Sequence, residues 1–264
     1  MPELVVRREA EGVVYLTLNR PRRLNALSSD LVLNLGQELS SIPVDTTAVV
    51  LKGSGSSFSA GHDLRDAAEH SKHERTDDEL RNSVERMQDI TRRLRNCPAP
   101  VIGAIHGYAV GAGCEIALSC DLVVAARDAQ FGFPETGVSL IVTNGVTALL
   151  ARSVGSVIAK ELILLGEFIT AERAAQLGLV NRVVDTEVDL DGAVADIVQR
   201  LRTRGPEAVR QSKRLIDDGL AADIEVILSR ESEASVIAER SANGVEGVVA
   251  FAEGRTPSYG LTLR

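Results

Sequence analysis

The sequence predicts an α/β fold in which repeated β-β-α units coil into a spiral, followed by an α-helical C-terminal region. Apolar strand segments alternate with helical segments, at residues 3–18 then 29–41, 48–52 then 65–96, and 101–105 then 114–120. From about Asn144 onward the pattern is almost wholly helical. Alternation of strands and helices favours a layered α/β core, so we expect such a core over residues 1–195 and a helical region over residues 196–264.

Composition bounds the class of protein. The chain has 264 residues, of which 44% are hydrophobic, enough for a sizeable core. No run reaches the roughly 18 apolar residues of a membrane span, and the N-terminus lacks the basic-then-apolar order of a signal peptide. We therefore expect a cytoplasmic protein that does not bind a membrane. A formal charge of −8 and 3% aromatic residues argue against a nucleic-acid partner. Three cysteines, Cys97, Cys114 and Cys120, lack metal-site spacing and are interpreted as reduced core thiols, with no metal expected.

The first unit begins with a predicted hairpin. Residues 3–9 and 13–18 are rich in β-branched residues and flank the turn-forming pair Glu11-Gly12. A helix follows, because Ser28 or Ser29 can cap it and apolar residues then recur at helical spacing. These apolar residues are Leu31, Leu35, Leu39 and Ile42.

The second unit carries a loop of small residues. A strand over residues 48–52 enters the segment 53–63, whose glycines and serines permit close approach of the backbone. Asp63 suits the N-cap of the next helix. Residues 65–80 are strongly charged and predict an exposed, mobile flap. A long helix is predicted over about residues 77–96.

The third unit contains the most informative stretch. A buried strand over residues 101–105 leads into residues 107–113, which are rich in glycine and alanine, and then into a helix over residues 114–120. A ligand could touch main-chain N–H groups here, because side chains are small and the helix start directs its positive dipole end to the same place. Glu115 lies in the first turn of that helix, and a carboxylate beside such amides is half of a catalytic site.

Two other interpretations of this stretch stay open. A dinucleotide-binding G-x-G-x-x-G motif is disfavoured, because Ile116 stands where the third glycine belongs. Tight packing between strand and helix, with Glu115 as an ordinary first-turn acid, agrees with the helix dipole. This stretch alone does not choose between packing and catalysis.

A second glycine-rich turn favours the catalytic hypothesis. Ala60-Gly61 and Ala112-Gly113 each follow a short strand, so the two alanine N–H groups could converge on one oxygen. A further strand over residues 121–126 leads to Glu135, a second acid, which directly follows a proline. The remaining predicted elements are a strand over residues 179–184 and helices over residues 144–154, 156–165, 170–177, 191–203, 206–218, 223–240 and 244–253.

Six segments in register resemble the enoyl-CoA hydratase/isomerase (crotonase) family over nearly the whole chain. They are residues 18–27, 58–64, 107–121, 131–135, 171–181 and 244–251. The resemblance implies a crotonase-like spiral with a helical C-terminal region, assembled as a homotrimer or as a hexamer formed by two trimers. It also implies an acyl-CoA thioester as substrate, with CoA as part of that substrate and no separate cofactor.

The resemblance assigns chemical roles. Family members hold the thioester oxygen by two backbone N–H groups, which match Ala60 and Ala112, and the hydratases carry two glutamates, which match Glu115 and Glu135. Adding water across a 2,3-double bond conjugated to a thioester needs an activated water at C3, a proton at C2 and a cradle for the enolate oxygen. We therefore expect an enoyl-CoA hydratase in which Glu115 is the general base and Glu135 the protonated partner.

Other family positions contact CoA. The matching residues are Arg22, Ala26, Ala60, His62, Asp63, Leu64 and Gly111. Relatives also use a phenylalanine and a lysine near the C-terminus, often from a neighbouring subunit. Phe251 matches the phenylalanine, whereas Gly254 stands at the lysine position and leaves Arg255 as the candidate for the charge.

The clearest departure from the family lies in residues 138–147, where many hydratases have a proline and then a Gly-Ala-Gly-Gly run. Here the segment reads Val142-Thr143-Asn144-Gly145. It usually helps to line the acyl end of the pocket, so the preferred acyl chain is left open. An enoyl-CoA isomerase or another acyl-CoA enzyme of this family is the alternative activity, and an inactive acyl-CoA binder is the alternative without catalysis.

Overall fold

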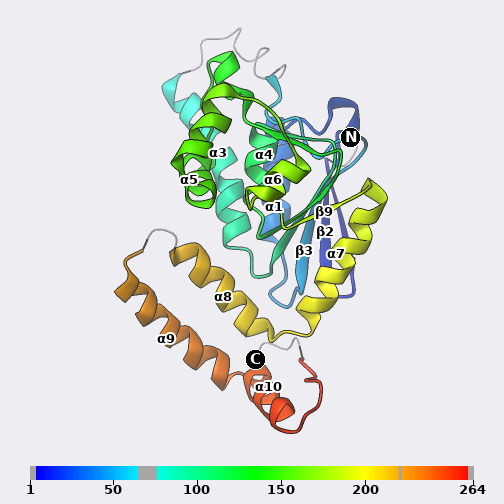
Figure 1. Ribbon diagram of the computed structural model, residues 1–264, viewed down its shortest axis with the longest axis vertical. Helices are drawn as coiled ribbons and strands as arrows, with labels where there is room; N and C mark the ends of the chain where they lie inside the picture. The colour runs from blue at the N-terminus through cyan, green and yellow to red at the C-terminus, as the bar shows by residue number, and fades with distance from the viewer. Residues whose placement is uncertain (1–3, 65–75, 220–221, 261–264) are drawn as a thin grey trace.

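The computed structural model describes residues 4–64, 76–219 and 222–260 (Figure 1). Its main sheet has the strand order β1-β2-β3-β4-β6-β9. The first two strands are antiparallel, and every later neighbour in this order is parallel. The strands are β1 (Val5–Ala10), β2 (Val13–Leu18), β3 (Ala48–Gly53), β4 (Val101–Ile105), β6 (Leu122–Ala126) and β9 (Arg182–Val184). The α/β spiral with a helical C-terminal region is confirmed.

A second, three-stranded sheet lies beside the first and has the order β5-β7-β8. Its strands are β5 (Tyr108–Val110), β7 (Gln130–Gly132) and β8 (Ile169–Thr170). The sequence analysis did not predict them, because two or three residues are too few to display an alternating pattern. They matter for function, since β5 leads into the glycine-rich turn and β7 leads into the second acid.

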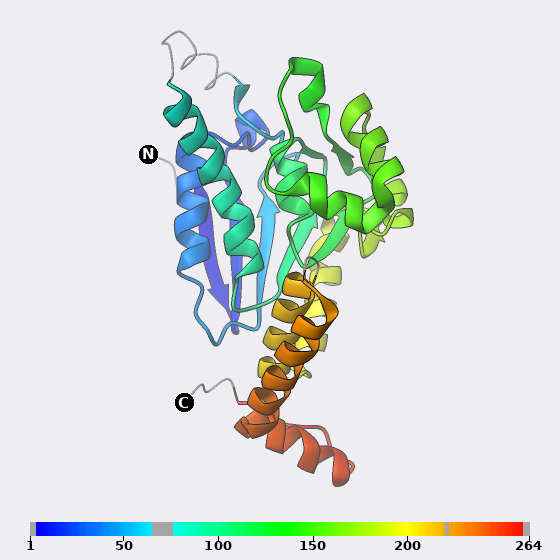
Figure 2. The ribbon, with the colours of Figure 1, turned by 90° about the vertical axis from the view of Figure 1, so that its left-hand side faces the viewer.

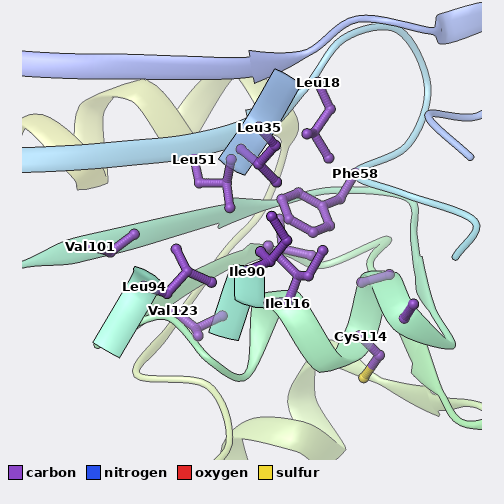
Figure 3. Close-up of a cluster of buried hydrophobic side chains, with 14 of the residues drawn as sticks. Leu18, Leu35, Leu51, Phe58, Ile90, Leu94, Val101, Cys114, Ile116 and Val123 are labelled. Carbon is purple, nitrogen blue, oxygen red and sulfur yellow. The ribbon is translucent and has the colours of Figure 1, made fainter. Parts of the chain in front are cut away.

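Helices cover both faces of the main sheet. On one face lie α1 (Ser29–Ser40), α3 (Asp77–Arg95) and α4 (Ala112–Ala117), and on the other lies α7 (Glu187–Arg202). Figure 3 shows side chains of the larger apolar cluster meeting between strands and helices, with Phe58 and Ile116 among them. The remaining helices are α5 (Val146–Leu165), α6 (Ala171–Gln176), α8 (Pro206–Gly219), α9 (Ile224–Arg240) and α10 (Ala242–Ala252), with short 3-10 turns η1 (Pro21–Arg23) and η2 (Pro134–Val138).

Capping residues fix where the predicted helices begin. The Ser28 side chain accepts a hydrogen bond from the Leu31 N–H at the start of α1, as expected from the sequence. Thr76 and Glu79 form a capping box at the start of α3. Residues 65–75, which carry most of the predicted flap, lie outside the described residues, and from Asp77 onward that segment is helical.

Several helix boundaries differ from the prediction: α7, for example, begins at Glu187, four residues before the predicted start at residue 191. Two differences have a local cause. Helix α4 begins at Ala112, two residues early, because Gly111 adopts a left-handed φ of 57° and supplies the N-cap. The two helices predicted at residues 144–165 form one element, α5, which breaks at Gly155, where φ is 79°. Only glycine adopts such a backbone freely, so the break in α5 lies at the residue that separates the two predicted helices.

The predicted division at residue 195 falls inside α7. That helix runs unbroken to Arg202 and buries Leu190, Val194 and Val198 against the sheet. The core therefore extends through α7, and the helical extension begins after it. Figures 1 and 2 show α8, α9 and α10 extending away from the body.

Ion pairs attach the extension to the core. The Lys213 ammonium on α8 lies 2.5 Å from the Asp121 carboxylate, and Arg95 on α3 lies 3.0 Å from Asp217 on α8. Lys213 is nearly buried, so its charge relies on this partner. Within the described ranges, no helix is both long enough and apolar enough to span a bilayer.

Candidate active site

Loops that follow β2, β3 and β4 meet at one edge of the main sheet. These strands are parallel, so their carboxyl ends share that edge. Segment 58–63 lies between the other two loops. Phe58 and Ser59 donate their N–H groups to carbonyls of residues 106 and 108, while Ala60 and Asp63 donate theirs to carbonyls of residues 24 and 27. The middle loop is thus held on both sides.

Asn25 fixes this arrangement from inside. It is fully buried, and its Nδ2 donates to the carbonyls of Ser54 and Ser57, each at 2.8 Å. Its own carbonyl accepts from Ser59 Oγ at 2.9 Å. The Arg20 guanidinium adds an ion pair to Asp63 at 2.9 Å. No local sequence pattern singles out Asn25, because its partners lie about thirty residues away along the chain.

The structure corrects the orientation expected for Ala60. Its N–H donates to the Leu24 carbonyl at 2.8 Å, so it faces away from the loop that carries Ala112. Leu27 and His62 form a parallel bridge in which Leu27 bonds to the neighbours of His62. In such a bridge the N–H and carbonyl groups of His62 itself point away from Leu27. The His62 N–H, two residues after the expected one, therefore points toward the side of Ala112.

Close packing explains the glycines of these loops. A Cβ on Gly61 would lie 2.4 Å from the Val110 carbonyl oxygen and 3.2 Å from the Ala112 nitrogen. A Cβ on Gly113 would lie 2.6 Å from the Ser59 carbonyl oxygen. Only glycine fits at either position, and the absence of side chains brings the backbones at residues 61–62 and 112 together.

Glu115 is buried and firmly held. It lies in the first turn of α4, as predicted, with 2% of its surface exposed. Its Oε1 accepts from the Thr143 N–H at 2.6 Å, and its Oε2 accepts from Asn144 Nδ2 at 2.7 Å and from Thr143 Oγ1 at 3.3 Å. Burial raises its pKa to about 7; the Thr143 N–H opposes the shift, and the nearby Glu135 adds to it.

Glu135 reaches the same place from another element. It lies in η2, directly after β7, and β7 pairs with β5 immediately before Gly111. A Cβ on Gly111 would lie 2.9 Å from Glu135 Oε1, so the carboxyl packs on the turn that starts α4. Glu135 Oε2 is buried without a hydrogen-bond partner among the described residues. Burial raises the pKa of Glu135.

The predicted CoA contacts fall into two groups. One group, made of the residues in the segments after β2, β3 and β5, lies together at the site edge; its members are Arg22, Ala26, Ala60, His62, Asp63, Leu64 and Gly111. The other group lies apart, because α10 packs on α8 and α9 at the far end of the chain (Figure 1). Phe251 there is 88% exposed, and Arg255 is paired with Glu246 and Glu253, each at 2.6 Å.

Thr143 and Asn144 have a role that the sequence analysis missed. Their segment departs from the family pattern and was expected to help line the acyl end of the pocket. The structure places both residues on the Glu115 carboxylate. The sequence did contain one hint of a fixed turn here. Asn144-Gly145 stands directly before a predicted helix, and asparagine and glycine favour left-handed turns of the kind that precede a helix.

The cysteines are free thiols with no assigned part in the chemistry. Cys97 and Cys114 are buried free thiols, and burial raises the pKa of each. In the part of the chain that the structure describes, no three histidine, cysteine, aspartate or glutamate side chains cluster as a metal would require.

A β-β-α spiral followed by a helical C-terminal region is the fold of the crotonase class of enzymes. Residues 8–261 match the enoyl-CoA hydratase/isomerase family, and the chain belongs to that family.

Relatives within the family have different named activities. The chain is 38% identical to the short-chain-enoyl-CoA hydratase of Clostridium acetobutylicum, over 94% of each protein. It is 36% identical to the 1,2-epoxyphenylacetyl-CoA isomerase of Escherichia coli, over 98% of this chain and 99% of that one. An enoyl-CoA hydratase structure from Mycobacterium smegmatis superposes with a TM-score of 0.90 at 35% identity, covering 97% of this chain and 98% of that one. The family is therefore established, and these relatives leave the reaction to be argued from the site.

Proposed function

We propose that this protein is an enoyl-CoA hydratase, which adds water reversibly to a 2-trans-enoyl-CoA and yields a 3-hydroxyacyl-CoA. The observation that carries the proposal is a pair of carboxyls that approach the Gly111 turn from separate elements. Glu115 is buried, and Glu135 is half-buried with one buried oxygen. Hydration needs one group to take a proton from water and one to give a proton to carbon, and two carboxyls with raised pKa values can share that work near neutral pH.

Glu115 is the general base in this proposal. Three hydrogen-bond donors surround its carboxylate, and donors favour the ionised form that accepts a proton. As Glu115 removes a proton from water, the oxygen bonds to C3 and the π electrons of the double bond move toward the thioester oxygen. Glu135, whose Oε2 has no donor nearby among the described residues, carries the proton that C2 receives.

Backbone amides stabilise the enolate oxygen that forms between these events. The Ala112 N–H at the start of α4 is one candidate, and the direction of the Leu27–His62 bridge supports the His62 N–H as the other. Ala60 then shapes the loop instead of donating to the thioester. Such preorganised donors are typically worth about 10²–10³-fold in rate. The thioester supplies the electron sink, so this mechanism calls on no metal or redox cofactor.

Incubation with crotonyl-CoA tests the proposal. Loss of the conjugated-thioester absorbance, together with identification of 3-hydroxybutyryl-CoA, would support hydration. A product with a shifted double bond would favour an enoyl-CoA isomerase instead. One relative within the family is named as an isomerase. Binding of CoA esters without turnover would favour an inactive binder and would contradict the proposal.

We also propose that the chain assembles as a homotrimer, or as two stacked trimers, through the helical extension. Apolar side chains on this extension are exposed in the single chain, including Ile224, Ile237, Val248 and Phe251. Exposed apolar surface of this extent usually meets another subunit. A neighbouring chain could then bring Phe251 and Arg255 to the CoA, whereas in the single chain they lie far from it. Light scattering at two concentrations tests the assembly, and a monomer at both would contradict it.

A further inference from the structure

Asn144 carries an unused acceptor beside the general base. The residue is 2% exposed, and its Nδ2 donates to Glu115 Oε2 at 2.7 Å. Its Oδ1 is buried and has no hydrogen-bond partner among the described residues. Exchanging the two atoms of the amide would not help, because it would set an oxygen against the Glu115 carboxylate. The orientation of the amide is therefore fixed by Glu115, and its oxygen is left for another donor.

An unpartnered buried oxygen is unusual enough to need a cause. Leaving such a group unsatisfied costs about 1–3 kcal/mol, and native structures retain few of them. The backbone supports the same position: Asn144 has a left-handed φ of 51°, which asparagine tolerates better than most residues, and Gly145 then caps α5. The left-handed backbone at Asn144 thus places its side-chain amide against Glu115.

Water is the donor whose geometry fits. A water that attacks C3 gives one hydrogen to Glu115, and its second O–H needs an acceptor that directs the lone pair toward the substrate. Asn144 Oδ1 is bonded to the same carbon as the nitrogen that grips Glu115, so it lies alongside that carboxylate. Oδ1 is closed to water in the unliganded chain, so a water admitted beside it when substrate binds would be the one that donates to both residues.

We propose that Asn144 positions the attacking water, with Nδ2 holding the Glu115 carboxylate and Oδ1 accepting the second hydrogen of the water. This inference rests on the proposed hydratase function. In the step itself, one O–H bond of water breaks and its proton passes to Glu115, the oxygen forms a bond to C3, and the π electrons move to the thioester oxygen. Asn144 keeps its bonds, and Glu135 then protonates C2.

Glycine and aspartate variants separate positioning from folding. Asn144→Gly removes the amide but keeps the left-handed backbone without strain. Asn144→Asp keeps the shape and replaces the donor with an oxygen that opposes Glu115. We expect kcat for crotonyl-CoA hydration to fall about 10- to 100-fold in Asn144→Gly and further in Asn144→Asp, with KM within about twofold of wild type. Loss of the donor also raises the pKa of Glu115, so the acid limb of the rate profile moves to higher pH in both variants.

The control is Glu11→Gly. Glu11 has a left-handed φ of 51° like Asn144, but it lies in the exposed turn before β2, at the opposite edge of the sheet from the site. Its kcat and pH profile should match those of wild type, which isolates the loss of the Asn144 amide from the introduction of a glycine.

Each outcome has a meaning. Asn144→Gly with kcat within about twofold of wild type and an unmoved acid limb would overturn the inference while leaving the hydratase function intact. A wild-type enzyme that binds crotonyl-CoA without hydrating it would overturn the proposed function first, and the water-positioning role with it. If Asn144→Gly has a lowered melting temperature, the pKa of Glu115 can be measured instead by nuclear magnetic resonance titration of folded Asn144→Asp. An unchanged pKa would contradict the proposal that Asn144 holds the Glu115 carboxylate.

Discussion

The two carboxyls of the site have opposite surroundings. Glu115 on α4 is held by the Thr143 backbone and hydroxyl and by the Asn144 amide, whereas Glu135 in η2 has one buried oxygen without a partner among the described residues. Both are buried enough to raise their pKa values. Donors favour a carboxylate and their absence favours a carboxylic acid, so the contrast supports our proposal of a base at Glu115 and an acid at Glu135. In the proposed mechanism, the same residue type serves two roles because its environments differ.

The largest effect should come from removing either carboxyl. Glu115→Gln and Glu135→Gln should each lower kcat about 10³-fold or more, because glutamine can neither take nor give the required proton. CoA-ester binding, measured by calorimetry, should stay within about threefold. A full rate in either variant would break the assignment of two acting carboxyls.

The pH dependence should expose the base. A general base works when ionised, so kcat should rise as pH increases through the pKa of Glu115, which is about 7. Initial rates from about pH 5 to about pH 9 should show an acid limb in that region. A profile that is flat down to about pH 5 would mean that Glu115 is not the titrating base.

Stability should change in the opposite sense to activity. The folded-state pKa of Glu115 lies above its ordinary value of 4.5, so the stability linked to this group is present below about pH 4.5 and is lost as pH rises to about 7. Glu115→Gln, which cannot ionise, should therefore be more stable than wild type at about pH 8, by at most about 3 kcal/mol. The gap should close at about pH 4.5. Thermal unfolding at both pH values tests this, and an equal difference at both would contradict the linkage.

The smallest effect should come from Thr143→Val. This change removes the long 3.3 Å hydroxyl contact to Glu115 Oε2 but keeps the backbone N–H that donates at 2.6 Å. The remaining donors should hold the carboxylate, so kcat should fall by less than about threefold, and the acid limb should move less than in Asn144→Gly. A loss as large as that of Asn144→Gly would show that the hydroxyl, not the amide, is the main support of the base.

Much of the fold follows from local sequence. Apolar spacing and a capping serine located α1, and short apolar runs located β3 and β4. The long helix α3 was predicted as well, from the segment that ends at the prolines after it. Glycine and alanine around residue 112 identified the turn, and its Glu115 lies in the first helical turn as expected. These features depend on neighbours in the chain, and sequence patterns report such neighbours directly.

The rest depends on contacts between distant residues. Which N–H of residues 60–63 faces Ala112 is decided by the bridge between Leu27 and His62, and no pattern in either segment reveals it. The hydrogen bond from Asn144 to Glu115 joins residues 29 positions apart. The placement of Phe251 and Arg255 far from the site edge follows from the direction in which the helical extension leaves the core.

Hydration in water labelled in its oxygen, followed by mass spectrometry of the product, tests most directly whether this site adds water to the double bond and whether Glu115 is required. The wild-type enzyme should convert crotonyl-CoA to 3-hydroxybutyryl-CoA with one labelled oxygen at C3, and Glu115→Gln should form almost none. An unlabelled product with a displaced double bond, or full label incorporation by Glu115→Gln, would contradict the account.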